Sequence, residues 1–217
     1  MSREDVMSLL EAKRIIAILR GALRGRELEI LAALEQAGIA VVEISIVSPD
    51  FDATLARIAA AFGSRMAIGA GTILTLDDLN RAIAAGASFI VSPDGNREVI
   101  EATLRAGLVS VPGAYTPTEI VQVQRWGADA VKLFPAGGLG PEYVRAVRAP
   151  LPDLRLVPTG GVRLADLPAY WQAGAWAVAV GSELVNASRI NDPDLAELSS
   201  VARAFAIAAE KNPHGAK

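Results

Sequence analysis

Cysteine is absent from this sequence of 217 residues, which excludes a disulfide framework and thiolate catalysis. Histidine occurs once, at His214, so a histidine-rich divalent metal site is not expected, although a Mg²⁺ site made only of carboxylates stays open. Runs of basic residues are also missing and the formal net charge is −3, so we expect no nucleic-acid partner.

Long apolar runs are missing as well. No segment approaches the roughly 18–20 uncharged residues that span a membrane. The opening "MSREDVMSLLEAKR" is charged and lacks the apolar stretch of a signal peptide. We therefore expect a soluble, cytoplasmic protein.

Lysine is scarce, and its distribution is uneven. Of 21 basic residues only four are lysines, namely Lys13, Lys132, Lys211 and Lys217. The first precedes the first apolar run and the last two lie near the C-terminus, whereas Lys132 interrupts the short apolar run "DAVKLF". A lysine in that position requires an explanation.

Glycines that end helical segments reveal the organisation of the chain. They recur at intervals of 25, 23, 21 and 20 residues and then, after Gly127, of 47. Each follows an amphipathic pattern and precedes an apolar run, as a helix C′ glycine does before a strand. The positions are Gly38, Gly63, Gly86, Gly107, Gly127 and Gly174.

Eight apolar runs alternate with these helical segments. They are "RIIAIL", "AVVEISIV", "MAIGAG", "SFIVS", "LVSVPG", "DAVKLF", "LRLVPTG" and "WAVAVG". Helix starts agree with this division, with an N-cap predicted at Ser48 before Pro49 and a capping box predicted at Thr116. Strict alternation predicts parallel strands, and eight units predict an α/β fold of the TIM (β/α)₈ barrel class with a short N-terminal helix. An open doubly wound sheet is the alternative.

One barrel domain is expected over residues 1–217, since no linker or change in composition divides the chain. The tail from about Asn212 is expected to be frayed.

Alternation along two strands predicts a buried lysine and carboxylate. In "AVVEISIV" the apolar Val42, Ile44 and Ile46 form the helix-facing set, which turns Glu43, Ser45 and Val47 inward.

In "DAVKLF" the same rule turns Lys132 inward, into the same interior as Glu43. A structural ion pair is the plain interpretation. Arginine serves as the cation almost everywhere else, however, and only lysine supplies a neutral amine for a Schiff base. The sequence therefore predicts a nucleophilic lysine with Glu43 as its acid–base partner.

Two glycine turns predict an anion site. "PTGGV" follows the seventh run and "VGSE" follows the eighth, each expected to lead into a helix N-terminus. Loops at these two positions form the recurrent phosphate site of such barrels. Arg20 and Thr72 end the first and third runs, where either suits a substrate carboxylate.

With these residues in this order, the sequence resembles the KDPG/KHG aldolase family, from about Lys13 to Val185. "RIIAILR", "VEIS", "GAGT", "IVSP", "VPGAYTPTE", "VKLFPA", "GPEYVRA", "VPTGGV" and "AVGSELV" are similar to that family's motifs and occur in the same order. These enzymes are class I aldolases that act on 2-keto-3-deoxy-6-phosphogluconate and 4-hydroxy-2-oxoglutarate.

The resemblance implies a Schiff-base lysine at Lys132 and a general acid–base at Glu43, with no cofactor. It implies carboxylate contacts from Arg20 and Thr72. Phosphate contacts would come from the two glycine turns, and three further residues would line the pocket. The residues concerned are Gly160, Gly161, Gly181 and Ser182 for phosphate, and Pro93, Phe134 and Thr159 for the pocket. It also implies a homotrimer that acts on a small phosphorylated keto acid.

One position departs from the family pattern. Many members carry an arginine four residues after the glutamate, where Val47 stands here. This transfers the carboxylate contact to Arg20. Members that act on 2-keto-3-deoxy-6-phosphogalactonate tend to have valine before the double glycine, so Thr159 favours the gluconate epimer.

A non-covalent phosphosugar isomerase or synthase and a sugar-phosphate-binding barrel remain alternatives, because one fold supports many chemistries.

Overall fold

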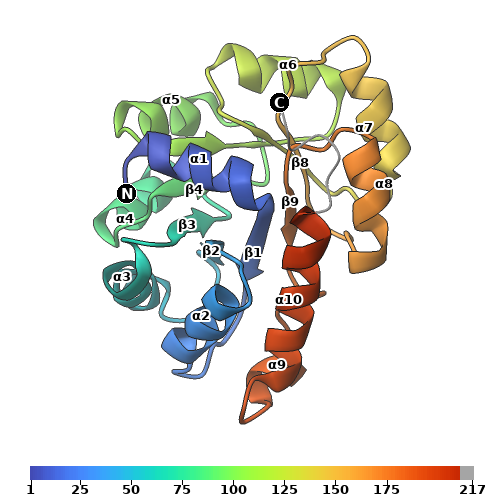
Figure 1. Ribbon diagram of the computed structural model, residues 1–217. Helices are drawn as coiled ribbons and strands as arrows, with labels where there is room; N and C mark the ends of the chain where they lie inside the picture. The colour runs from blue at the N-terminus through green and yellow to red at the C-terminus, as the bar shows by residue number, and fades with distance from the viewer. Residues whose placement is uncertain (211–217) are drawn as a thin grey trace.

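The computed structural model describes residues 1–210, in which strands alternate with helices (Figure 1). The strands are β1 (Ile15–Leu19), β2 (Val41–Ser45), β3 (Ala67–Gly71), β4 (Phe89–Val91), β5 (Val109–Val111), β6 (Gly113–Ala114), β7 (Val131–Leu133), β8 (Leu156–Pro158) and β9 (Val178–Val180). The helices are α1 (Arg3–Lys13), α2 (Glu27–Gln36), α3 (Phe51–Phe62), α4 (Leu76–Ala84), α5 (Arg97–Arg105), α6 (Pro117–Arg125), α7 (Gly140–Arg148), α8 (Leu167–Gln172), α9 (Ala187–Asn191) and α10 (Ala196–Glu210), with a short 3₁₀ turn η1 (Leu164–Asp166). All eight predicted apolar runs contain a strand. The tail predicted to fray lies outside the described residues.

The parallel strands form a curled sheet in two parts. One part has six strands in the order β5-β4-β3-β2-β1-β9, and the other has three in the order β6-β7-β8. A single parallel bridge between Thr159 and Ala179 links β8 to β9. The predicted α/β class with parallel strands is therefore confirmed. The prediction of a complete eight-stranded TIM (β/α)₈ barrel is not confirmed, because the hydrogen-bonded ladders form two sheets.

Pro112 causes one of the two interruptions. It divides the predicted fifth strand into β5, which pairs with β4, and β6, which pairs with β7. Proline has no backbone N–H to donate to a ladder, but its carbonyl still accepts from the backbone N–H of Lys132 at 2.9 Å. The chain thus passes from one sheet to the other within a single residue.

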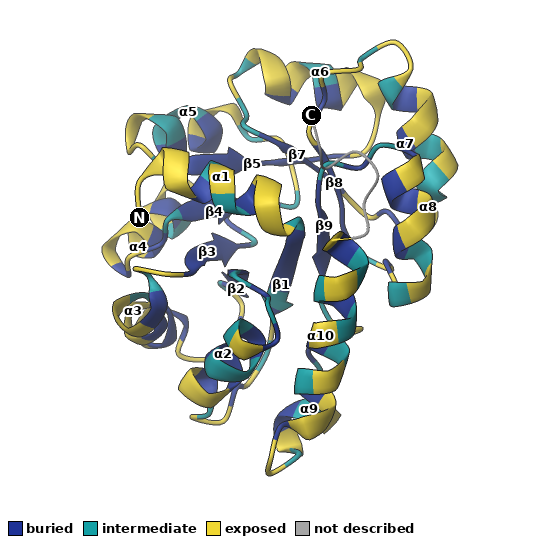
Figure 2. Cartoon of the chain, in the orientation of Figure 1, coloured by how far each residue is buried: buried dark blue, intermediate teal, exposed yellow. Residues whose placement is uncertain are grey.

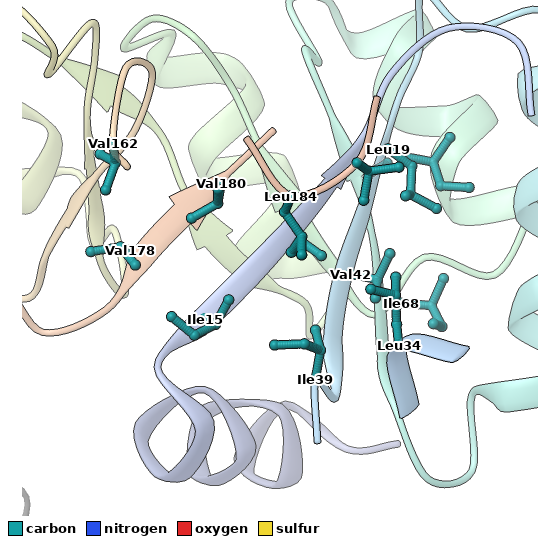
Figure 3. Close-up of a cluster of buried hydrophobic side chains, with 14 of the residues drawn as sticks. Ile15, Leu19, Leu34, Ile39, Val42, Ile68, Val162, Val178, Val180 and Leu184 are labelled. Carbon is teal, nitrogen blue, oxygen red and sulfur yellow. The ribbon is translucent and has the colours of Figure 1, made fainter. Parts of the chain in front are cut away.

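Side chains divide into an inner and an outer apolar layer, as the alternation predicted. Figure 2 shows that the strands are mostly buried, whereas the helices carry both buried and exposed residues. Figure 3 shows part of the outer layer, where Ile15 and Leu19 of β1 and Val178 and Val180 of β9 project from the sheet. The inner layer is a separate cluster, which includes Val41 of β2. Because β2 ends at Ser45, the prediction that Val47 points inward is wrong: Val47 lies in the following loop and is 58% exposed.

The N-terminal helix closes one end of the sheet's interior. Val6 and Leu10 of α1 are fully buried in the inner cluster, together with residues near the amino ends of strands, such as Ile16, Val41 and Ala67. A capping box at Ser2 and Asp5 fixes the start of this helix. With the amino end filled, a cavity can form only toward the carboxyl ends of the strands.

The structure confirms one of the two predicted helix caps. Thr116 makes the predicted capping box with Glu119, and Pro117 occupies the first turn of α6. The N-cap predicted at Ser48 is wrong, because α3 begins two residues later with Asp50 as its N-cap. The Ser48 hydroxyl instead accepts from the backbone N–H of Gly21 at 3.1 Å, which ties the loop after β2 to the loop after β1.

Within residues 1–210, no helix has the length and hydropathy needed to cross a membrane.

Candidate active site

A cavity of about 690 Å³ opens at the carboxyl ends of the strands. All eleven residues singled out from the sequence line it. They are Arg20, Glu43, Thr72, Pro93, Lys132, Phe134, Thr159, Gly160, Gly161, Gly181 and Ser182. These residues come from loops and strands spread over most of the chain, so the fold assembles them into one site.

Lys132 reaches the cavity from the middle of β7. Its neighbours Val131 and Leu133 face the outer apolar layer, which directs the lysine inward. The residue is only 5% exposed, and its Nζ lies 5.1 Å from the centroid of the Phe134 ring. Within the described chain the amine has no hydrogen-bond acceptor and no ion-pair partner. A buried amine in this state is free to react with a ligand.

Glu43 enters the cavity from β2 and is 2% exposed. Its Oε2 has no hydrogen-bond partner. Gly71 of β3 leaves room for this carboxyl group, since a Cβ there would lie 2.8 Å from Oε1. Burial raises the pKa of Glu43, and the nearby charge of Lys132 opposes that effect more weakly.

No direct ion pair joins the two groups. Among the ion pairs formed within residues 1–210, none brings a Glu43 oxygen within 4.0 Å of the Lys132 amine. The plain interpretation of a structural salt bridge therefore does not describe this pair. A lysine and a glutamate face one cavity, and neither neutralises the other through direct contact.

Arg20 and Thr72 occupy the rim next to these groups. Arg20 follows β1, which lies between β2 and β9, and its exposed guanidinium pairs with no other residue of the described chain. Thr72 follows β3 and adopts a left-handed φ of 64°, which is unusual for a β-branched residue. Its hydroxyl shares a hydrogen bond of 2.8 Å with that of Ser45.

The loops after β8 and β9 present backbone donors to the cavity. Gly160 and Gly161 turn the chain with φ of 83° and 78°. Several backbone N–H groups in these loops donate to no acceptor within residues 1–210, which suits them to an anion. They include those of Gly160, Gly161, Val162, Gly181, Ser182 and Glu183. The sequence predicted that each glycine turn leads directly into a helix, and this is wrong. The 3₁₀ turn η1 begins only at Leu164, and α9 begins only at Ala187.

Thr159, Pro93 and Phe134 complete the predicted set. Thr159 is 2% exposed, and its hydroxyl donates to the carbonyl of Val157 at 2.9 Å. The oxygen of this hydroxyl can therefore accept a hydrogen bond from a ligand but has no proton left to give. Pro93 and the half-exposed Phe134 form the wall beside Lys132.

Sequence reasoning assigned no role to several other lining residues, among them Ser45, Arg163, Glu183 and Asn186. Ser45 had a detectable pattern, because it lies two positions after Glu43 on the same strand face. Arg163 and Glu183 lie in loops, where no periodicity indicates which way a side chain points. Within residues 1–210, histidine, aspartate and glutamate form no group of three that could hold a metal ion.

Comparison with protein families gives one match over most of the chain. The model described as "KDPG and KHG aldolase" matches residues 6–201.

Named relatives carry two substrate names. The 2-dehydro-3-deoxy-6-phosphogalactonate aldolase of Escherichia coli is 32% identical over 192 residues, which is 88% of this chain and 94% of that protein. The 2-dehydro-3-deoxy-phosphogluconate aldolase of Treponema pallidum is 36% identical over 137 residues, 63% of this chain and 65% of that protein.

A solved structure shares the same fold. It is KDPG aldolase from Legionella pneumophila with pyruvate captured at low pH as a covalent carbinolamine intermediate. It superposes with a TM-score of 0.84 at 25% identity and covers 92% of this chain and 97% of that one.

Proposed function

Because the chain belongs to the KDPG and KHG aldolase family and is thus an aldolase, a carbon–carbon lyase, we propose that it cleaves a 2-keto-3-deoxy-6-phospho sugar acid to pyruvate and glyceraldehyde 3-phosphate. The observation that carries this proposal is the buried, unpaired amine of Lys132 in one cavity with the unpaired carboxyl of Glu43.

Lys132 is the proposed nucleophile. Its neutral amine attacks the C2 ketone, and loss of water gives an iminium ion. The iminium nitrogen then accepts the electron pair of the C3–C4 bond as that bond breaks. The position of Lys132 supports this step, because its amine faces the cavity and is paired with no residue of the described chain.

Glu43 is the proposed acid–base group. As C3–C4 breaks, its carboxylate takes the proton of the C4 hydroxyl, and glyceraldehyde 3-phosphate leaves. The same group returns the proton to C3 of the enamine. Water then hydrolyses the iminium and releases pyruvate and the free lysine. The raised pKa of Glu43 supports this double role, since a carboxyl with an ordinary pKa holds a proton poorly near neutral pH.

The two charged ends of the substrate are proposed to bind to different groups of residues in the cavity. The carboxylate meets Arg20 and Thr72, next to the Glu43 strand, and a guanidinium suits it because it binds in bidentate fashion. The phosphate meets the backbone N–H groups of the β8 and β9 loops, which include Gly160, Gly161, Gly181 and Ser182. Pro93, Phe134 and Thr159 line the space between.

The gluconate epimer is the first candidate, on the basis of Thr159. Its hydroxyl donates to Val157, so Thr159 presents an acceptor oxygen to the cavity, whereas members that act on the galactonate epimer tend to have valine there. The galactonate epimer is the second candidate, because the Escherichia coli relative is named for it. Cleavage of 4-hydroxy-2-oxoglutarate to pyruvate and glyoxylate would use the same residues without a phosphate.

Pyruvate release from each of the three compounds tests the proposal. Wild-type protein should give the highest kcat/KM with one phosphorylated epimer, and Thr159→Val should lower the ratio of gluconate to galactonate activity. A protein that forms no pyruvate from any of the three is not the proposed aldolase.

We also propose that the two sheets close into one eight-stranded barrel in a single domain. The continuity of β5 with β6 and the bridge between β8 and β9 support this arrangement. A homotrimer is proposed from the family resemblance, and light scattering of the purified protein tests it.

A further inference from the structure

Arg163 is a cationic side chain beside the proposed phosphate loops, and it lines the same cavity as Lys132. It directly follows the turn made by Gly160 and Gly161. This turn packs closely on the loop after β7, since a Cβ at Gly161 would lie 2.8 Å from Cα of Gly137. The position from which Arg163 leaves the loop is therefore well defined.

Asp166 holds one edge of the Arg163 guanidinium. Its carboxylate accepts from Nε and from Nη2, each at 3.0 Å, and from the backbone N–H of Arg163 at 3.1 Å. The pair lies within a single turn, three residues apart. It orients the guanidinium without filling the cavity, and Nη1 donates to no residue within 1–210.

Arg163 is the cation between two carboxylates at this end of the cavity, those of Asp166 and Glu183. Glu183 also lines the cavity, in the loop after β9. The hydrogen bonds that Arg163 donates to Asp166 are the main cause of its raised pKa, and the charge of Glu183 contributes weakly in the same direction. Without Arg163, two carboxylates would remain near an incoming dianion.

We propose that Arg163 is a specificity-determining residue whose free guanidinium edge contacts the substrate phosphate, so that the enzyme prefers phosphorylated over unphosphorylated 2-keto acids. This inference rests on the proposed aldolase function. A guanidinium suits the role because its planar fork binds phosphate oxygens in pairs. Asp166 orients the fork before binding, which reduces the entropy lost when the phosphate arrives.

Inorganic phosphate is the direct probe, and calorimetry measures its Kd. Arg163→Ala should weaken phosphate binding by about 10- to 100-fold, because a charge-assisted contact is lost and the two carboxylates are left unopposed. The phosphate Kd of Arg163→Lys should lie between those of the wild type and Arg163→Ala, since lysine keeps the charge but lacks the planar fork of the guanidinium. The matched control is Arg145→Ala, which removes an exposed arginine that is likewise paired three residues away, with Glu142 of α7, outside the cavity. It should bind phosphate as the wild type does.

Steady-state kinetics supply the second readout. In Arg163→Ala, kcat/KM should fall by about 10- to 100-fold for the phosphorylated substrate, mostly through KM, and by less than about twofold for 4-hydroxy-2-oxoglutarate. Equal losses on both substrates, or an unchanged phosphate Kd, would overturn the inference.

Borohydride trapping of pyruvate on Lys132 separates this inference from the proposed function. The adduct should form in the wild type and in Arg163→Ala, which also reports that the variant is folded. If the wild type traps pyruvate but does not bind phosphate, the inference fails and the aldolase mechanism stands. If the wild type traps no pyruvate, it is the proposed function that fails.

Discussion

Glu43 carries a carboxyl group that the fold buries without giving both of its oxygens a partner. A second buried carboxylate, Glu27 of α2, differs in this respect because it is paired with Arg57 at 2.5 Å. An ionised buried carboxylate without a partner lowers the stability of the fold. An ion pair with an arginine offsets this cost. This contrast is expected if Glu43 is kept for chemistry and Glu27 for structure.

Glu43→Gln should therefore be more stable than the wild type at neutral pH. The pKa of Glu43 is raised in the folded state, so the stability contributed by its protonated form is fully present below about 4.5, the ordinary value, and is lost as the pH rises through the folded pKa. Glutamine does not ionise, so the variant loses no stability at this position over the same pH range. Denaturant unfolding measures the free energy of unfolding of both proteins. The difference between them should be near zero below about pH 4.5 and should grow to about 1–3 kcal/mol in favour of the variant at higher pH.

Glu27→Gln is the matched control for this prediction. Its ion pair with Arg57 is broken, so it should be no more stable than the wild type at pH 7. A Glu43→Gln variant less stable than the wild type at pH 8 would contradict the account of Glu43 as an unpaired buried acid.

Ser45 is expected to position Thr72 for the substrate carboxylate. The hydrogen bond between their hydroxyls holds a threonine that has a left-handed backbone. Ser45→Ala should raise KM by about 3- to 10-fold with little change in kcat, and Ser45→Thr should restore it. Ser88→Ala removes a hydroxyl that donates to Ile68 at 2.9 Å outside the cavity, and it should leave KM unchanged. A fall in kcat with constant KM for Ser45→Ala would assign Ser45 to the chemical step instead.

Among the connections between elements, the loops after β8 and β9 form the proposed phosphate site. Their free N–H groups depend on the turn at Gly160 and Gly161. Both residues have positive φ, which glycine adopts without steric strain. Close contact between Gly161 and Gly137 adds a second restriction that has nothing to do with φ. Neither restriction acts on Lys132 directly.

Gly161→Ala should therefore weaken inorganic phosphate binding by at least about tenfold and leave pyruvate trapping on Lys132 intact. The added Cβ would lie 2.8 Å from Cα of Gly137, so the loop must move. Gly138→Ala is the control, because a Cβ there meets nothing within 4 Å. Phosphate affinity measured by calorimetry should be unchanged in this control, and an unchanged affinity in Gly161→Ala would mean that the loop does not bind phosphate.

At the scale of the whole molecule, regular alternation made much of the fold predictable. The period of two along β2 and β7 was enough to direct Glu43 and Lys132 inward, because one strand face must meet the outer apolar layer. The same pattern failed at Val47, where β2 had already ended. Alternation carries no information about where a strand stops.

Features set by contacts between distant segments could not be predicted. The Ser48 hydroxyl binds the backbone of Gly21, which local capping rules do not foresee. Pro112 divides a strand between two sheets, although its sequence reads as one apolar run. Arg163 reaches the cavity from a loop, where direction depends on the packing of Gly161. Each case depends on tertiary geometry.

The proposed reaction depends on a covalent imine between Lys132 and the substrate. Peptide mass spectrometry after incubation with pyruvate and sodium borohydride tests it most directly, with Lys132→Arg and the exposed Lys13→Arg measured in parallel. We predict a reduced pyruvyl adduct on the peptide that contains Lys132 in the wild type and in Lys13→Arg, and none in Lys132→Arg. Wild-type protein that binds pyruvate without forming this adduct, or an adduct that persists in Lys132→Arg, would contradict the claim.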